Sequence, residues 1–245
     1  MAHHILLIGG HGKIAQLLTP LLLAKSWNVT SMIRTASQQP AIEKLGQGLP
    51  GKLSVLVHSV ADVKTENDAK SILQEVNPDW VVWSAVKKFL TVSYLSSRRG
   101  RAPWWTDDDW AVAQKVNNEI LPDYFKAKVA ADEVLTILAK ERVEKEEKES
   151  VEVKDRFCGV SLRPGTLTEE KAGGVKLGKV GAGGKTSRAS VAETVVEVLG
   201  REVRGWVDVV DGDENVGEAV ERFEREGWDA VEGENLGEMK KRVES

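Results

Sequence analysis

The chain has 245 residues, of which 29% are charged and 41% hydrophobic, and its formal net charge is −4. No apolar run approaches the ~20 residues of a membrane span and no basic leader precedes the first strand, so we expect a cytoplasmic α/β protein that binds no membrane. One cysteine, Cys158, and four histidines predict neither a disulfide nor a metal site. The dense basic cluster at 98–101 is followed by acidic residues, which argues against nucleic-acid binding.

The N-terminal segment predicts a strand, a glycine turn and a helix. The run "HILLIG" is of the buried-strand type, and "KIAQLLTPLLLAKSW" has apolar residues at helical spacing. Between them, Gly9, Gly10, Gly12 and Ala15 satisfy both G-x-x-G-x-x-A and G-x-G-x-x-A. Glycines let the backbone approach a pyrophosphate closely, and a helix N-terminus offers free amides. The turn therefore predicts a nucleotide site, the alternative being a tight turn without a ligand.

The second predicted strand, "VTSMIR", ends in Arg34, and no acidic residue occurs at 26–41. An acid about 20 residues past the glycines would bind the ribose 2′-hydroxyl of NAD, whereas an arginine favours the 2′-phosphate of NADP. We therefore predict NADP, with NAD as the alternative, although Arg34 could also be a plain surface residue. A third strand, "LSVLVHS", leads to Asp62, which would contact adenine or cap the next helix.

A helix at "DAKSILQEV" and a strand at "DWVVWSA" continue the alternation, which predicts a doubly wound parallel sheet. The next segment, "VVWSAVKKFLTVSYLSS", holds two strands without a crossover, although parallel neighbours need a connection of a dozen or more residues. Three explanations stay open: an antiparallel turn near 85–88, one long bent strand, or a deleted segment.

The second half predicts fewer strands and longer helices. We expect a polar loop at 98–109 in which Trp104 and Trp105 form a lid, a partner surface or simple packing. The remaining expected elements are a helical stretch at 110–140 interrupted at Pro122, a strand at "FCGVSLRPG", a mobile glycine-rich loop at 173–184, and a helix–strand–helix ending at "VGEAVERFEREGW". We interpret residues 1–245 as a single domain whose smaller, substrate-side portion begins at about residue 160.

Tyr124 and Lys128 stand four residues apart in the helical pattern "PDYFKAKVAADEVL", so both side chains project from one face. A tyrosine with a pKa of ~10 transfers protons poorly at neutral pH, and a nearby ammonium stabilises the phenolate. The spacing therefore offers a proton-transfer pair. The alternative is an amphipathic helix with a half-buried tyrosine and a solvated lysine.

Taken together, these residues resemble the short-chain dehydrogenase/reductase superfamily, in particular its atypical, epimerase-like branch and fungal NAD(P)-binding proteins of unassigned substrate. The resemblance covers nearly the whole chain and is carried by "IGGHGKIA", "FLTVSYLSS", "YFKAKVAADEVL" and "SLRPGTLT". It implies a Rossmann-type fold in which Tyr124 is the general acid/base, Lys128 binds the nicotinamide ribose and tunes Tyr124, and Ser93 orients a substrate oxygen.

The resemblance also implies cofactor-binding positions in the loops that follow the strands. They are Gly9, Gly10, His11, Gly12, Lys13, Ile14, Arg34, Asp62, Val63, Ser84, Ala85, Pro164, Gly165, Thr166 and Leu167.

Two departures stand out. The helix that the family carries between its fourth and fifth strands is missing, and Tyr94 replaces the second small hydroxyl residue after Ser93, which leaves Ser96 and Ser97 as further candidates. We expect an NADP-dependent oxidoreductase acting on a small carbonyl or alcohol, as a monomer or homodimer. The alternatives are a non-catalytic NADP(H)-binding sensor and a truncated, inactive relative.

Overall fold

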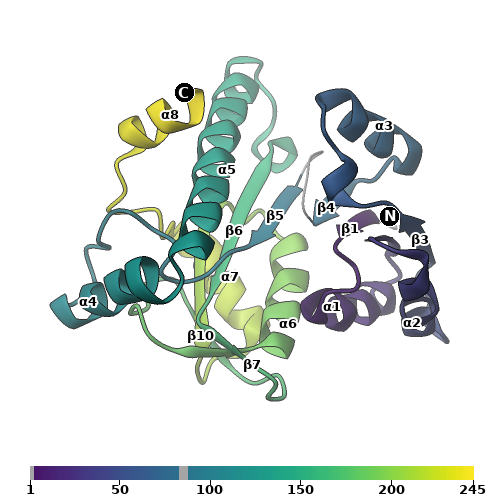
Figure 1. Ribbon diagram of the computed structural model, residues 1–245, viewed down its shortest axis with the longest axis horizontal. Coiled ribbons are helices and arrows are strands. Elements are labelled where there is room, and N and C mark those ends of the chain that lie inside the picture. Colours follow the sequence, from purple (N-terminus) through teal and green to yellow (C-terminus); the bar gives the residue numbers. More distant parts are fainter. Residues whose placement is uncertain (1–2, 83–87) are drawn as a thin grey trace. The chain divides into compact units, whose positions relative to one another are not determined.

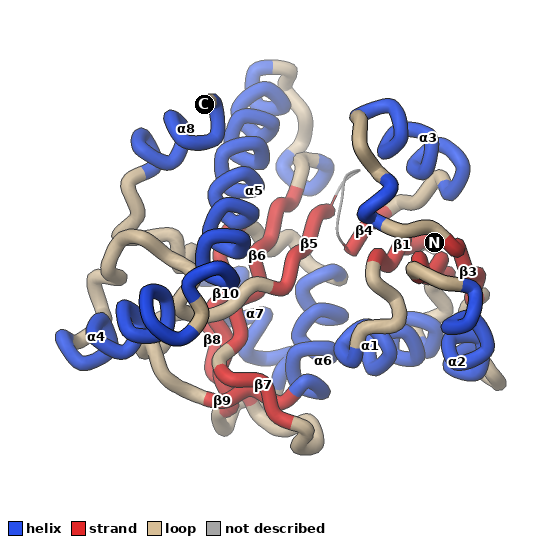
Figure 2. The backbone as a smooth tube through the Cα atoms, viewed as in Figure 1, coloured by secondary structure: helices blue, strands red, loops and turns tan. Residues whose placement is uncertain are grey.

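The structure, a computed structural model, describes residues 3–82 and 88–245. The chain divides into two compact units, Met1–Phe89 and Leu90–Ser245. The elements of both units are labelled in Figure 1 and coloured by type in Figure 2.

The first unit is a parallel sheet with helices on both of its faces (Figure 1). The strand order is β3-β2-β1-β4, and these strands run parallel. Leu6, Met32 and Val81 form a buried cluster against which Ile72 and Leu73 pack. The elements are β1 (His4–Ile8), α1 (Lys13–Ala24), β2 (Asn28–Ile33), α2 (Gln39–Glu43), β3 (Leu53–Val57), α3 (Glu66–Val76) and β4 (Trp80–Val82). The predicted alternation of strands and helices is confirmed here.

The fifth strand, β5 (Lys88–Val92), runs parallel to β4, with Phe89 opposite Val81. The antiparallel turn and the single bent strand are therefore wrong as explanations of this segment, because two separate strands pair in parallel. Ser84 and Ala85, two predicted cofactor-binding residues, lie outside the described residues.

The second unit continues from β5 with the strand order β5-β6-β10-β8. Strand β10 pairs in parallel with β6 and antiparallel with β8, and a second small sheet joins β7 to β9 in parallel. The strands are β6 (Cys158–Pro164), β7 (Thr166–Thr168), β8 (Val175–Leu177), β9 (Lys185–Ser187) and β10 (Gly205–Asp211). The glycine-rich segment expected to be a mobile loop therefore contains β8, because Val175 and Leu177 are buried against the sheet.

The helices of the second unit follow the sequence expectation at Pro122 and differ from it near the C-terminal end. They are α4 (Asp107–Lys115), α5 (Pro122–Lys148), α6 (Arg188–Leu199), α7 (Val216–Glu226) and α8 (Leu236–Glu244). The expected interruption at Pro122 is confirmed, because the helical backbone breaks at Leu121 and Pro122 begins α5, where the amide that proline lacks would have no intrahelical partner. Helix α8, which the sequence analysis did not predict, is held by buried Met239 against Ile137 and Trp206.

The two tryptophans of the polar loop are packing residues. Trp105 is 2% exposed in a buried cluster with Ala102 and Ala113, and the indoles of Trp104 and Trp105 both donate to the Val180 carbonyl at 2.9 Å. No helix in the described parts of the chain is long and apolar enough to cross a membrane.

Candidate functional site

The glycine turn after β1 leaves one side of the backbone open. Gly9 has φ +75, and a Cβ added there would meet no atom within 4 Å. Gly10 is different, because an added Cβ would lie 1.8 Å from Ser31 Oγ, and its amide donates to the Met32 carbonyl at 2.9 Å. Gly10 thus packs the turn onto β2, while Gly9 leaves room for a ligand.

The N-terminus of α1 is free of side-chain caps. Gly12 is its N-cap and supplies no side chain, and the first turn holds no acidic residue. The first amides of a helix lack intrahelical acceptors and carry partial positive charge. This helix end can therefore receive an anion.

A cavity of about 490 Å³ lies beside this turn. Four predicted residues line it: Gly9, His11, Gly12 and Arg34. The sequence analysis missed the other lining residues, Met32, Ile33, Gln38, His58, Ser59, Val60 and Ala61. They follow the ends of β2 and β3, and the rule that ligands bind at the carboxyl ends of parallel strands could have found them.

Arg34 reaches this cavity from the end of β2. Its backbone amide is held by the Gln38 side chain at 3.2 Å, whereas its exposed guanidinium has no partner among the described residues. A free guanidinium presents a planar set of donors suited to a phosphate. Within the described parts of the chain, Arg34 therefore offers an unpaired positive charge to an anionic ligand in this cavity.

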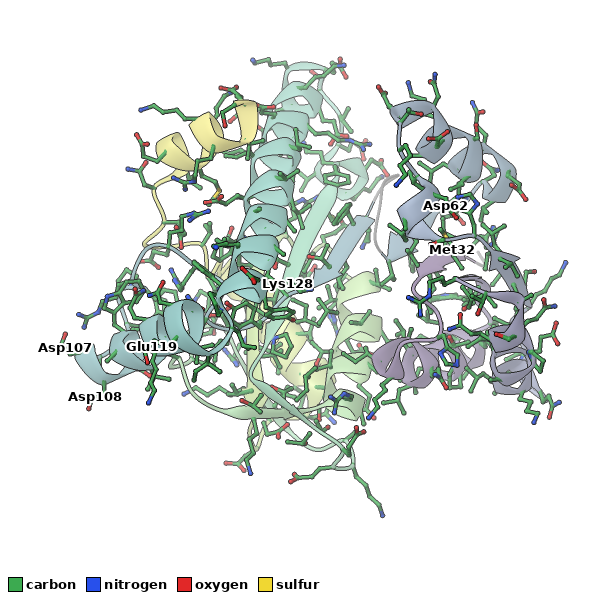
Figure 3. The ribbon with its side chains drawn as sticks, viewed as in Figure 1. Met32, Asp62, Asp107, Asp108, Glu119 and Lys128 are labelled. Atoms are coloured by element: carbon green, nitrogen blue, oxygen red, sulfur yellow. The ribbon has the colours of Figure 1, made fainter. Side chains whose placement is uncertain are left out.

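Several predicted cofactor residues of the first unit lie outside the lining. Gly10, Lys13 and Ile14 belong to the turn and to α1 without lining the cavity. Asp62 ends the short turn Val60–Asp62, and Val63 lines a separate apolar cavity of about 100 Å³ next to α3. Figure 3 labels Asp62 and Met32 in this unit.

Tyr124 and Lys128 come together on α5 in the second unit, as their spacing predicted. The Lys128 Nζ atom lies 5.6 Å from the centroid of the Tyr124 ring and donates to the Val92 carbonyl at 2.8 Å. Tyr124 is 44% exposed, so its ring is accessible from solvent. Figure 3 labels Lys128 near the start of α5.

The electrostatics of this pair differ from the sequence expectation. Burial raises the pKa of Tyr124, and the Asp132 carboxylate adds to this because it repels a phenolate. Burial also lowers the pKa of Lys128. The net pKa shift of Tyr124 is therefore upward, with burial as its largest cause.

Ser93, which the resemblance implied would orient a substrate oxygen, is bound to a buried carboxylate. Ser93 is 4% exposed and donates to Asp132 Oδ2 at 2.6 Å. The Tyr94 ring instead lies 5.2 Å from the Tyr124 ring, and its hydroxyl donates to Asn117 Oδ1 at 2.7 Å. A second tyrosine, Tyr94, thus lies beside Tyr124 with its ring tilted by 43°.

Asp132 is the centre of a buried polar network that the sequence analysis missed. Its carboxylate accepts hydrogen bonds from the side chains of Ser93, Ser97, Ser161 and Arg163. Its place four residues after Lys128, on the same helical face, was the available signal.

Arg163 and Asp208 extend this network into the core. The Arg163 Nε atom donates to Asp208 Oδ1 at 2.7 Å, and both side chains are 0% exposed. Asp208 Oδ2 is buried and has no hydrogen-bond partner in the part of the chain that the structure describes, and burial raises the pKa of this carboxyl to about 6.

The last four predicted cofactor residues form the turn from β6 into β7. Pro164 ends β6, the Gly165 amide donates to Val209 O and to Thr186 Oγ1, and Thr166 and Leu167 pair with β9. The histidine, cysteine and carboxylate side chains of the described residues form no group that could hold a metal ion.

Comparison with known proteins agrees with the fold. The chain is 25% identical over 251 residues to "UPF0659 protein C216.03" of Schizosaccharomyces pombe, covering 88% of this chain and 92% of the relative. The oxidoreductase ylbE of Lactococcus lactis has a similar structure, with a TM-score of 0.63, 17% identity, and coverage of 91% and 97%. No protein-family model matches the chain.

A short-chain dehydrogenase/reductase of Veillonella parvula, solved with NADP, is also similar. Its TM-score is 0.56 at 17% identity, covering 88% of this chain and 98% of that one. The predicted Rossmann-type α/β fold with a mostly parallel sheet is thereby confirmed.

Proposed function

We propose that this chain is an NADP-dependent oxidoreductase of the atypical short-chain dehydrogenase/reductase type, acting on a small carbonyl or alcohol. The observation that carries the proposal is the open glycine turn at the uncapped N-terminus of α1, with the free Arg34 guanidinium beside the same cavity. The similar protein of Veillonella parvula supports the proposal, because it was solved in complex with NADP.

The first unit is assigned to cofactor binding. The space over Gly9 and the free amides of α1 fit a diphosphate, and Arg34 fits the 2′-phosphate that distinguishes NADP from NAD. The remaining predicted residues, Asp62 and Val63 among them, would complete the nucleotide site.

The second unit is assigned to proton transfer. When bound, the nicotinamide supplies or accepts hydride. Tyr124 would give a proton to, or take one from, the substrate oxygen, and Lys128 would hold the ribose. Tyr94 would orient the substrate oxygen through its hydroxyl, while Ser93, bound to Asp132, would position the end of β5.

A direct titration tests cofactor binding. NADPH added to the full chain should give a saturable rise in nicotinamide fluorescence, with NADH binding more weakly. Absence of a saturable signal at micromolar protein would overturn the proposal.

A second candidate is a non-catalytic NADP(H)-binding regulator, which the raised pKa of Tyr124 favours because such a phenol transfers protons poorly at neutral pH. NADPH would then bind with the same affinity, but no carbonyl compound in a broad panel would be reduced. A measurement of turnover therefore distinguishes the two candidates, whereas a measurement of NADPH binding does not.

A further inference from the structure

A second cavity lies within the second unit, along α5 and away from Tyr124 and Lys128. Its volume is about 460 Å³, within the size range of small-molecule sites. Helix α5 lines it from Leu135 to Glu147, the starts of β6 and β10 form its floor, and Leu236 of α8 closes one side. The first lining residue, Leu135, follows Lys128 by seven residues, so about 10 Å of helix separates this cavity from the proton-transfer pair.

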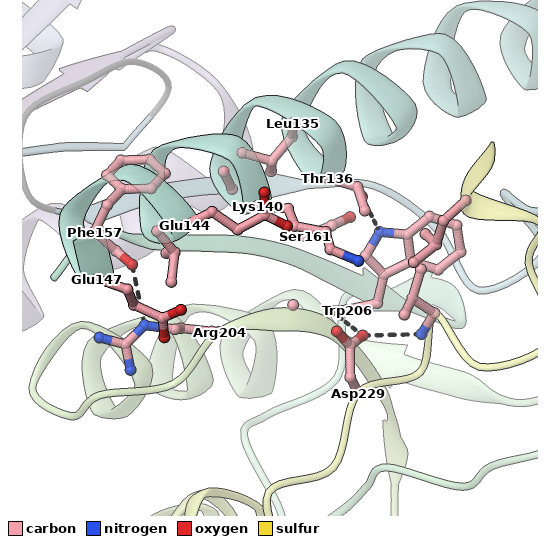
Figure 4. Close-up of a pocket in the computed structure, with 16 residues that line it drawn as sticks. Leu135, Thr136, Lys140, Glu144, Glu147, Phe157, Ser161, Arg204, Trp206 and Asp229 are labelled. Carbon is pink, nitrogen blue, oxygen red and sulfur yellow. Dashed lines mark hydrogen bonds between the residues drawn. The ribbon is translucent and has the colours of Figure 1, made fainter. Parts of the chain in front are cut away.

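The wall of this cavity is mainly apolar. Figure 4 shows Phe157 at one end and Trp206 at the other, with Leu135 on the helix above them. Ala139, Val143, Val231 and Leu236 complete the apolar lining. The Trp206 indole is fixed by donating to Thr136 Oγ1 at 2.8 Å, so this wall is preformed.

One carboxylate opens into this apolar space. Asp229 Oδ1 accepts from the amides of Trp206 and Val231, each at 2.9 Å, which fixes the side chain. Oδ2 has no hydrogen-bond partner among the described residues, and Asp229 is an exposed residue that lines the cavity. Gly205, at φ +82, makes this placement possible, because a Cβ there would lie 2.2 Å from Oδ2.

The other charged side chains of the lining either already bind another residue or are exposed to solvent on α5. The Arg204 guanidinium donates to the carbonyls of Phe157 and Glu202, and Glu147 pairs with Arg156 at 2.6 Å. Lys140 and Glu144 are exposed on α5 and oppose each other in charge. Among the lining carboxylates of the described residues, Asp229 is therefore the one that is held by two backbone amides and still has an oxygen without a hydrogen bond.

We propose that this cavity is a binding site for a small organic cation, an ammonium carried on an aromatic or aliphatic body. The apolar wall would bury the body, and Asp229 Oδ2 would accept hydrogen bonds from the ammonium. Desolvation by the surrounding protein raises the pKa of the Asp229 carboxyl. Arg163 compensates only in part, because its guanidinium is bound to Asp208 and Asp132.

The probe is 2-phenylethylamine, compared with neutral 2-phenylethanol and anionic 3-phenylpropionate on the full chain. Binding is followed by NMR at the indole N–H signal of Trp206, a residue of this wall. A hydrogen bond to a charged group supports a preference of about tenfold or more for the ammonium over the alcohol.

The matched variant is Asp229→Asn, which keeps an acceptor for the two amides and removes the charge. It should abolish the ammonium preference, while Glu218→Gln, an exposed change on α7, should leave it intact. Should Asp229→Asn fail to fold, Val143→Phe serves instead, because its added bulk should weaken all three probes.

The site is overturned if none of the probes saturates at millimolar concentration. It is also overturned if the alcohol or the carboxylate binds as well as the amine, or if Asp229→Asn retains the preference. Because none of these measurements involves NADPH, failure here leaves the oxidoreductase proposal standing.

Discussion

Ser93 donates a hydrogen bond to Asp132, with 2.6 Å between the serine Oγ and the aspartate Oδ2. The adjacent residue, Val92, accepts a hydrogen bond from Lys128, one helical turn before Asp132. Two consecutive residues at the end of β5 thus bind two consecutive turns of α5. The orientation of Tyr124 and Lys128 therefore depends on a buried network to which Tyr124 does not belong.

Removing the negative charge of Asp132, at the centre of this network, should lower the stability of the fold. In Asp132→Asn, the amide NH₂ would oppose donors that now point at a carboxylate, and the buried Arg163 would lose one of its two carboxylate partners. We expect the free energy of unfolding to fall by about 3 kcal/mol. Urea unfolding measures it, with the exposed Asp123→Asn on the same helix as control. A loss no larger than that of the control would contradict the role of the network.

Tyr124→Phe tests proton transfer. The variant should reduce turnover by about 10²-fold to 10⁴-fold, the range for a lost general acid. NADPH affinity should stay unchanged, because the nucleotide cavity is lined by residues of the first unit. Steady-state NADPH oxidation and fluorescence titration measure the two effects. Full activity in this variant would contradict the role of Tyr124 in proton transfer.

Arg34→Ala tests the choice of cofactor. Loss of a charge-assisted contact to the 2′-phosphate should weaken NADPH binding by about tenfold or more and leave NADH binding nearly unchanged. Lys44→Ala, an exposed basic residue outside the cavity, is the matched control. Equal weakening of both cofactors by Arg34→Ala would mean that Arg34 does not read the 2′-phosphate.

Stability should depend on pH through Asp208. Burial raises the pKa of this acid from 3.8 to about 6, against the opposing effect of Arg163 and Arg98. The folded state therefore binds this proton more tightly than the unfolded state does. The contribution to the free energy of unfolding is full below pH 3.8 and is lost as the pH rises through about 6, a change of about 3 kcal/mol.

Asp208→Asn cannot titrate and isolates this effect. The stability of the wild type relative to this variant should decline between about pH 4 and pH 7 and then level off, as measured by urea unfolding across that range. A difference that stays constant with pH would show that Asp208 ionises normally in the folded chain.

Local sequence patterns were enough for much of the fold. The strands of the first unit are short apolar runs, and the turn at Gly9 to Gly12 was readable because a tight strand-to-helix turn demands glycine. The pairing of Tyr124 with Lys128 could also be predicted locally, because helical spacing alone puts both residues on one face. Short elements such as β8 and α8 could not be predicted from local patterns, because their stability comes from contacts with distant strands and helices.

The sequence by itself determined that this chain alternates strands and helices, carries a glycine turn suited to a nucleotide and presents a tyrosine and a lysine on one helix. Only the tertiary structure decided that Ser93 is bound to Asp132, 39 residues away, and that Tyr94 stands beside Tyr124. It also decided that the pKa of Tyr124 is raised and that Asp229 opens into an apolar cavity. The physical reason is that burial and hydrogen-bond partners arise from contacts between distant segments, which local spacing does not encode.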